Sequence, residues 1–254
     1  MVRYPRSVSA TEARMLSYAQ NGEDVLLDRV LQKKSGFYID VGAFHPIVDS
    51  VTKHFSAIGW RGINIEPNRE FVALLQEDRP DDVNLCLAAG RESGEALLHI
   101  LKARQGSTIS ALHFAQLDED SREGVQKVAV PVKTLAEICA EHAPDQIDFM
   151  KIDVEGAERS VIEGADWHRF RPRILVIEAV KPGGSEPNWQ GWEPLLLRES
   201  YLFQHFDGIN RFYLREEDQE LAPQFAVPVN YHDWYIRFGD IVQMQRMLAD
   251  RQPG

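Results

Sequence analysis

A chain of 254 residues, with 44% hydrophobic and 26% charged residues, is long enough for one α/β domain with an additional segment. Its 39 acidic and 28 basic side chains give a net charge of −11, which argues against nucleic acid or an anionic membrane as the main partner. No apolar run is long enough to span a bilayer, and the first residues lack the apolar core of a signal peptide, so a cytoplasmic protein is expected. The two cysteines, Cys86 and Cys139, are predicted to be buried, reduced thiols, and they are too few for a zinc site.

The hydrophobic pattern predicts alternating strands and helices up to residue 179. Residues 1–16 have no such pattern and are expected to form a flexible segment. Asn21 can cap the first helix. The expected strands lie at residues 37–41, 63–66, 83–88, 96–101, 128–132, 149–154 and 174–179. Further helices are expected at residues 50–58, around 71–75, at 135–140 and at 155–163, and the polar stretch at residues 103–127 is predicted to be a lid.

The order of these elements predicts the fold. Alternating strands and helices form a parallel sheet with right-handed crossovers. After them, strands at residues 201–206 and 211–214 flank residues 207–210, whose Asp-Gly-Ile-Asn sequence is a hairpin turn signal. The predicted fold is therefore α/β, with a doubly wound, Rossmann-like sheet that is mostly parallel and has a C-terminal antiparallel hairpin. This domain is expected at residues 17–215, and residues 216–254 are expected to pack on its core as an extension.

The ends of the first two strands indicate a nucleoside site. Asp40 and Gly42 end the first strand, and Glu66 ends the second. A strand–turn–helix–strand unit with an acid at the second strand's tip is typical of folds that bind a ribose. A dinucleotide site needs further glycines to approach a pyrophosphate, but Phe44 and Pro46 stand in that turn. The expected ligand is therefore a nucleoside without phosphates, and S-adenosylmethionine is the commonest such cofactor.

Acidic residues also end two later strands. Asp153 and Glu155 follow one buried strand, and Glu178 ends the next. Because the carboxyl ends of parallel strands share one edge of a sheet, these acids should lie in the same crevice as the ligand. His205, near the end of the strand at residues 201–206, is a secondary catalytic candidate, although a lone histidine on an apolar strand is more often a core residue.

Together these motifs resemble the FkbM family of S-adenosylmethionine-dependent methyltransferases, which have the class I methyltransferase fold. The resemblance runs from about residue 17 to residue 214. Its matching pieces are residues 17–24, 36–43, 59–62, 65–68, 151–158, 176–178 and 207–213. The resemblance implies O-methylation, usually of a sugar hydroxyl in bacterial polysaccharide, glycolipid or natural-product pathways. The implied partner is a small-molecule or glycan acceptor.

The resemblance also implies a set of cofactor-binding residues. They are Gln20, Asp40, Gly42, Ala43, His45, Ser50, Glu66, Pro67, Asn68, Ala88, Ala89 and Asp153. One departure concerns the helix after the first glycine. Many relatives have Ser-Asn-Thr there, whereas this chain has Ser50-Val51-Thr52, which removes the asparagine side chain from that contact.

The expected chemistry requires activation of a hydroxyl group. A sugar hydroxyl is a poor nucleophile at neutral pH, so a general base or a metal ion is expected. The groups available are Asp153, Glu155, Glu178 and His205, and two acids at adjacent strand ends can instead hold Mg²⁺. The alternatives are a nicotinamide-dependent oxidoreductase and a sugar-nucleotide-dependent transferase. The second would use an Asp-x-Asp metal-binding motif, and Asp118-Glu119-Asp120 matches that pattern.

Overall fold

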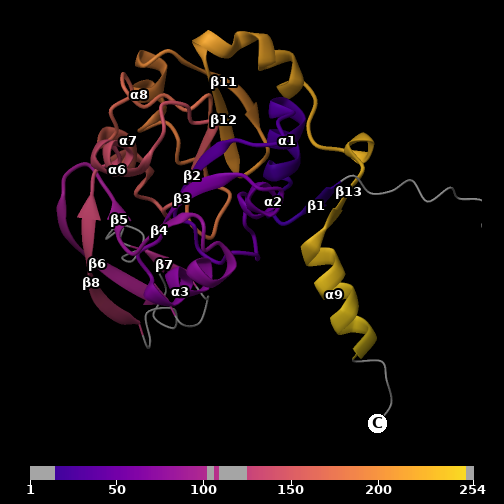
Figure 1. Ribbon diagram of the computed structural model, residues 1–254, viewed down its shortest axis with the longest axis horizontal. Helices are drawn as coiled ribbons and strands as arrows, with labels where there is room; N and C mark the ends of the chain where they lie inside the picture. The colour runs from indigo at the N-terminus through magenta and orange to yellow at the C-terminus, as the bar shows by residue number, and fades with distance from the viewer. Residues whose placement is uncertain (1–14, 102–105, 109–124, 250–254) are drawn as a thin grey trace, which may run out of the picture.

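A seven-stranded sheet forms the centre of the protein (Figure 1). The structure, a computed structural model, describes residues 15–101, 106–108 and 125–249. The strand order is β11-β12-β10-β9-β2-β3-β4. In chain order these strands are β2 (Phe37–Val41), β3 (Arg61–Ile65), β4 (Val83–Leu85), β9 (Phe149–Ile152), β10 (Ile174–Glu178), β11 (Tyr201–Phe206) and β12 (Asn210–Arg215).

The directions of the strands confirm the predicted fold. Neighbouring strands from β4 to β10 pair in parallel, and β12 pairs antiparallel with both β10 and β11. All residues of β9 are buried, as are those of β10 up to Ile177, which explains their continuous apolar sequences. A parallel doubly wound sheet that ends in an antiparallel hairpin is the predicted class I methyltransferase architecture.

Helices cover both faces of the sheet and form two apolar cores. One core contains residues of α6 (Leu135–His142), α7 (Glu158–Glu163) and α8 (Glu193–Arg198), which pack on side chains such as Ile39. The other core contains residues of α1 (Glu23–Leu31), α2 (Lys53–Ala57) and the 3₁₀ helix η2 (Glu216–Phe225), which pack on side chains such as Tyr38. Successive strand residues alternate between these cores because side chains of a strand point to opposite faces.

A smaller sheet lies beside the central one and corrects the predicted third strand. It has the order β5-β8-β6-β7, with β5 (Ala88–Ala89), β6 (Gly94–Leu101), β7 (Gly106–Thr108) and β8 (Gln126–Lys133). The prediction of one strand at residues 83–88 was wrong. The segment divides because β4 pairs with β3, whereas β5 pairs in parallel with β8. The predicted lid at residues 103–127 lies outside the described residues, apart from β7 and residues 125–127.

Several predicted boundaries were also wrong. The helix expected at residues 50–58 is only α2, and the helix expected from residue 155 begins at Glu158. It begins late because Glu155 and Gly156 have φ of 55° and 96°, in the left-handed region that a right-handed helix excludes. The first helix is preceded by Gly22 rather than by Asn21, whose side chain donates to the carbonyl of Asp207.

The residues after β12 behave in two ways. Phe225 of η2 is buried in the core that contains α1. In contrast, no residue of α9 (Phe238–Ala249) is buried among the described residues, and Figure 1 shows this helix projecting from the body. Before α9, β13 (Tyr235–Arg237) pairs in parallel with β1 (Met15–Ser17).

Helix α3 (Arg69–Asp78), which follows β3, and the short 3₁₀ helix η3 (Tyr231–Asp233) complete the described elements. No described helix has the length and apolar character needed to cross a membrane.

Candidate active site

The carboxyl ends of β2, β9 and β10 bring the predicted acids together around a buried lysine. Lys151 lies opposite Asp40 in the register of β9 and β2. Its Nζ donates to the carbonyl oxygen of Gly42 at 2.9 Å and lies 3.3 Å from Asp153 Oδ2 and 3.5 Å from Asp40 Oδ1. Burial lowers the pKa of Lys151, but the attraction of Asp153 and Asp40 outweighs it, and the net result is a raised pKa. The ammonium therefore stays charged between the two carboxylates.

Asp153 is the accessible member of this group. Its side chain is 34% exposed, whereas the side chain of Asp40 is 1% exposed. The hydroxyl of Thr52 donates to Asp40 Oδ2 at 2.6 Å, while Asp40 Oδ1 has no hydrogen-bond partner among the residues described. Asp40 is thus a buried, oriented acceptor, and Asp153 is the carboxylate that an incoming molecule can reach.

Gly42 is required by the close approach of two strand ends. Its φ is +80°, and a Cβ built on it would lie 1.8 Å from the carbonyl oxygen of Asp153. The amides of Gly42 and Ala43 both donate to the carbonyl of Ile65, at 2.9 and 3.1 Å. Only glycine fits this turn, because any side chain would separate the turn from Asp153.

Glu66 is buried at the tip of β3 and links two loops. Its Oε2 accepts the amide of Phe44 at 2.9 Å, and its Oε1 accepts the amide of Asn68 at 2.8 Å. Burial raises the pKa of Glu66 to about 7, although these hydrogen bonds oppose the shift. Each carboxylate oxygen keeps a second lone pair, so Glu66 retains capacity to accept ribose hydroxyls. The side chain of Asn68 also caps the N-terminus of α3. The Pro67 carbonyl accepts a hydrogen bond from the Cys86 thiol.

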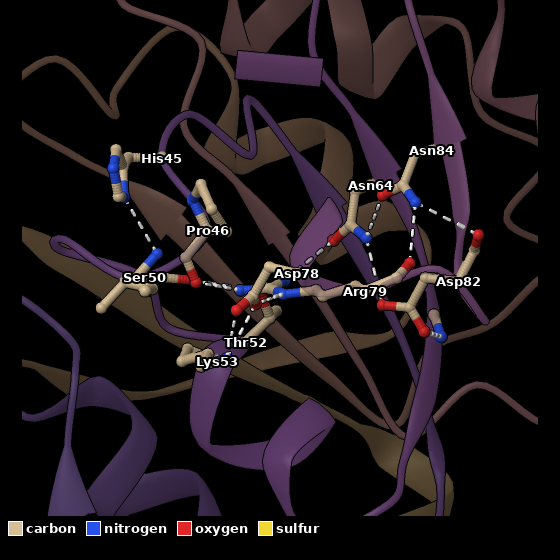
Figure 2. Close-up of polar contacts among 12 residues, drawn as sticks. His45, Pro46, Ser50, Thr52, Lys53, Asn64, Asp78, Arg79, Asp82 and Asn84 are labelled. Atoms are coloured by element: carbon tan, nitrogen blue, oxygen red, sulfur yellow. Dashed lines mark hydrogen bonds and ion pairs between the residues drawn. The ribbon is translucent and has the colours of Figure 1, made fainter. Parts of the chain in front are cut away.

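Two other predicted cofactor residues have structural partners in the turn after Gly42. His45 Nδ1 accepts the amides of Ile47 and Val48, each at 3.1 Å. Burial lowers the pKa of His45, which favours the neutral ring that can accept these bonds. Ser50 is buried and its hydroxyl accepts Arg79 Nη2 at 2.8 Å, so this side chain serves the turn itself (Figure 2).

Arg79, which the sequence reasoning missed, donates hydrogen bonds to several groups of the turn after Gly42 (Figure 2). The residue is 2% exposed, and its Nη1 donates to Thr52 Oγ1 at 2.7 Å and to Asn64 Oδ1 at 3.1 Å. Its Nη2 donates to the carbonyl of Pro46 at 2.7 Å. Because Thr52 in turn donates to Asp40, the guanidinium supports both the turn and the buried acid. No sequence motif signals this role, since an arginine just after an amphipathic helix is common on protein surfaces.

Glu178 is the acid whose chemistry the fold changes most. Its Oε2 is buried without a hydrogen-bond partner in the described part of the chain. Burial and the neighbouring acids Asp153, Glu155 and Glu158 together raise the pKa of Glu178 to about 10. The carboxyl is therefore protonated at neutral pH, which makes it a hydrogen-bond donor. Glu155, next to it, lies in the left-handed turn before α7.

The family follows from comparison with known proteins. The model of the Methyltransferase FkbM domain matches residues 40–215, most of the chain. The chain belongs to the FkbM family of methyltransferases. FkbM membership confirms the resemblance seen in the sequence and identifies a methyltransferase that depends on S-adenosylmethionine. Residues 17–24, which also contributed to that resemblance, lie before the matched region.

Individual relatives of this FkbM chain are distant. A stretch of 73 residues is 37% identical to Methyltransferase sdnD of Sordaria araneosa, but it covers only 25% of this chain and 28% of that protein. A TehB-like SAM-dependent methyltransferase from Corynebacterium glutamicum is 10% identical, with 78% of this chain and 89% of that chain covered and a TM-score of 0.42. An O-methyltransferase from Bacillus cereus in complex with SAH is 12% identical, covering 78% and 83%, with a TM-score of 0.40. These likenesses are too remote to bear on the acceptor.

The other predicted site residues of this FkbM chain belong to different parts of the fold from Asp153. Ala88 and Ala89 belong to β5 of the smaller sheet rather than to the tip of a central strand. Gln20 is exposed, and its carbonyl accepts Arg237 of β13 at 3.0 Å. His205 lines a cavity on the far side of β12, where it faces residues of α1.

The predicted Mg²⁺ alternative finds no support in the donor set. Among the described residues of the FkbM chain, no three histidine, cysteine or acidic side chains are gathered for a metal ion. The position between Asp40 and Asp153, which would suit a cation, is occupied by the ammonium of Lys151. A charged lysine there already offsets the repulsion between the two carboxylates.

The raised pKa of Glu178 predicts a pH dependence of stability in this FkbM enzyme. A carboxyl whose pKa rises from 4.5 to about 10 on folding favours the folded state fully below pH 4.5. That contribution is lost as the pH rises toward 10, because the unfolded chain ionises first. We expect the Glu178→Gln variant, which cannot ionise, to lose less stability than the wild type between pH 5 and 9, as measured by urea unfolding. Parallel pH curves for the two proteins would contradict the protonated state of Glu178.

Proposed function

We propose that this enzyme transfers the methyl group of S-adenosylmethionine to a hydroxyl group of a sugar, in a bacterial polysaccharide, a glycolipid or a natural product. The observation that carries the proposal is the accessible Asp153 carboxylate, held by Lys151 beside the protonated Glu178. Family membership favours this reaction over the nicotinamide and sugar-nucleotide alternatives. Asp118-Glu119-Asp120, on which the sugar-nucleotide alternative depended, lies outside the described residues.

The acidic strand ends fit the cofactor. S-adenosylmethionine supplies a methyl group on a positively charged sulfur, and it also carries an ammonium group and a ribose. Asp40 Oδ1, which lies 3.5 Å from Lys151 Nζ and has no hydrogen-bond partner among the described residues, is the oxygen proposed to accept from the ammonium group. Glu66, at the tip of the next parallel strand, suits the two ribose hydroxyls. These roles of Asp40 and Glu66 are parts of the proposal.

In the proposed mechanism, Asp153 and Glu178 divide the work on the acceptor. Asp153 accepts the hydroxyl proton as the oxygen attacks the methyl group, which is the step that a general base accelerates. Lys151, 3.3 Å from Asp153, holds that carboxylate in place. Glu178, protonated at neutral pH, donates a hydrogen bond to a neighbouring oxygen of the acceptor. Glu155, the other acid that the sequence offers for catalysis, lies in the adjoining turn before α7.

A transfer assay tests the proposed reaction. The protein is incubated with S-adenosylmethionine labelled on the methyl group and with two acceptor panels, one of glycans and sugar precursors and one of catechols, carboxylic acids and amines. Label on a sugar oxygen, located by mass spectrometry, supports the proposal. Transfer only to the second panel would contradict the sugar specificity, and transfer to nitrogen would also contradict O-methylation.

The proposed ribose contact predicts the behaviour of the Glu66→Ala variant. Losing a charge-assisted hydrogen bond should cost about 1.5–3 kcal/mol, or roughly a ten- to hundredfold loss of affinity for S-adenosylhomocysteine, measured by calorimetry. Thr134→Ala is a matched control, because it removes the cap of α6 far along the chain. That control should cost about 1 kcal/mol of stability without changing the affinity. Undiminished binding by Glu66→Ala would remove Glu66 from the cofactor site.

A further inference from the structure

A cavity of about 160 Å³ lies between the start of α1, the β11–β12 hairpin and residues 228–229. A cavity of this volume holds several water molecules, so it suits one small unit of a ligand. The lining residues are Asn21, Gly22, Glu23, Leu26, His205, Phe206, Asp207, Phe212, Pro228 and Val229. The cavity thus has both a polar and an apolar wall.

The polar wall is built around Glu23, which is 3% exposed. Its Oε1 accepts Asn210 Nδ2 at 2.8 Å, and its Oε2 accepts the amide of Asn21 at 2.7 Å. The same Asn210 amide donates to Asp207 Oδ2 at 3.2 Å, which ties the hairpin to α1. Burial and the charge of Asp207 raise the pKa of Glu23 to about 8, so this wall carries less negative charge than its composition suggests.

His205 is the polar group of the cavity with unused capacity. No hydrogen bond joins its imidazole to another residue in the described ranges, and its ring lies 5.9 Å from that of Phe212. Burial lowers the pKa of His205 despite the opposing charge of Asp207 on the hairpin, and Arg29 lowers it further. A neutral imidazole offers one donor and one acceptor. Both suit a hydroxyl group, which can accept and donate at once.

The cavity lies next to the acids of the active site. Asn210, which holds Glu23, is the register partner of Glu178 across β12 and β10. Directly paired residues of neighbouring strands place their side chains on the same face. The polar wall is therefore one strand away from Glu178, on the face of the sheet that α1 covers. The apolar wall of the cavity is formed by Leu26 of α1 and by Pro228 and Val229.

We propose that this cavity is a subsite for the acceptor and binds a hydroxyl-rich unit of it, such as a sugar ring next to the one that is methylated. Hydroxyl groups of that unit bind to His205 and to the Glu23–Asp207 wall, and its C–H face packs on the apolar side chains of Leu26, Pro228 and Val229. A metal ion or an amine is a poorer occupant, because the carboxylates of Glu23 and Asp207 already accept hydrogen bonds from the Asn210 amide and face a neutral imidazole. The inference rests on the proposed function and assigns His205 to binding the acceptor, where the sequence suggested catalysis.

The test compares His205→Ala with the wild type, both saturated with S-adenosylmethionine. The probes are methyl glycosides of glucose, galactose, mannose and rhamnose, with binding followed by saturation-transfer NMR, and the best sugar acceptor from the transfer assay. We expect roughly a tenfold weaker glycoside affinity and a roughly tenfold higher KM for the acceptor, with kcat kept within twofold. Val229→Phe, which fills the cavity from the extension, should raise KM in the same way.

The control is His168→Ala, because the side chain of His168 is 91% exposed and does not line this cavity. It should leave every parameter unchanged. A fall in kcat at unchanged KM for His205→Ala would show a catalytic role and overturn the subsite. Unchanged kinetics, or no glycoside binding by a protein that binds S-adenosylhomocysteine, would overturn it as well. If labelled methyl appears only on acceptors that are not sugars, it is the proposed function that fails.

Discussion

Turnover of the Asp153→Asn variant is expected to fall by about two to four orders of magnitude, because the variant loses the general base for the acceptor hydroxyl. Asparagine has nearly the same shape, keeps a contact with Lys151 through its carbonyl, and leaves the close approach of Gly42 undisturbed. Affinity for S-adenosylhomocysteine should therefore stay within a few-fold of the wild type. The measurement is methyl transfer to the sugar acceptor found in the assay above, together with calorimetry.

Glu178→Gln is the matched control for this prediction. Because burial and the neighbouring acids keep Glu178 protonated at neutral pH, glutamine preserves a neutral hydrogen-bond donor at that position. We expect this variant to keep most of its turnover, in contrast to Asp153→Asn. EDTA should leave wild-type activity unchanged, since Lys151 already supplies the positive charge beside Asp153. Equal losses in the two variants would contradict the division of roles, and restoration of EDTA-treated enzyme by Mg²⁺ would contradict the metal-free base.

The Arg79→Met variant is expected to lose about 3–5 kcal/mol of unfolding free energy. Methionine fills much of the space but leaves the oxygens of Pro46, Ser50 and Asn64 buried without their donor. Each unsatisfied buried group costs about 1–3 kcal/mol. Such a loss is a large part of the stability of a typical domain, about 5–15 kcal/mol. Urea unfolding measures the change, and cofactor affinity should fall as well, because Thr52 and Asp40 lose their support.

Arg159→Met is the control for this prediction. The side chain of Arg159 is 62% exposed and forms only an i,i+4 ion pair with Glu163, so its loss should cost less than about 1 kcal/mol. Arg79→Lys should fall between the two, since an ammonium cannot reproduce the forked geometry of a guanidinium. A cost for Arg79→Met no larger than that of Arg159→Met would show that the network in Figure 2 contributes little.

Local sequence patterns were sufficient for most strands of the central sheet. The apolar runs at β9 and β10 read as strands buried on both faces, and the residues at 207–210 read as a hairpin turn, because side-chain periodicity and turn chemistry are properties of neighbouring residues. The same reasoning located the acids at the carboxyl edge, since parallel strands must end on one side. Asp40, Lys151 and Asp153 do meet there.

Long-range contacts decided the rest. Residues 83–88 are predicted as one strand, but they contribute to two sheets because β4 pairs with β3 and β5 pairs with β8, which lies far along the chain. Arg79 gave no signal, since a buried guanidinium is defined by the acceptors that surround it rather than by its neighbours in sequence. The sequence offers Glu178 as a catalytic candidate and His205 as a secondary one. Burial and nearby charges make Glu178 a hydrogen-bond donor, and the fold places His205 in a cavity lined by α1 and the β11–β12 hairpin. A strand sequence specifies which residues point to one face, but the dielectric, the charges and the packed partners on that face exist only once the chain has folded.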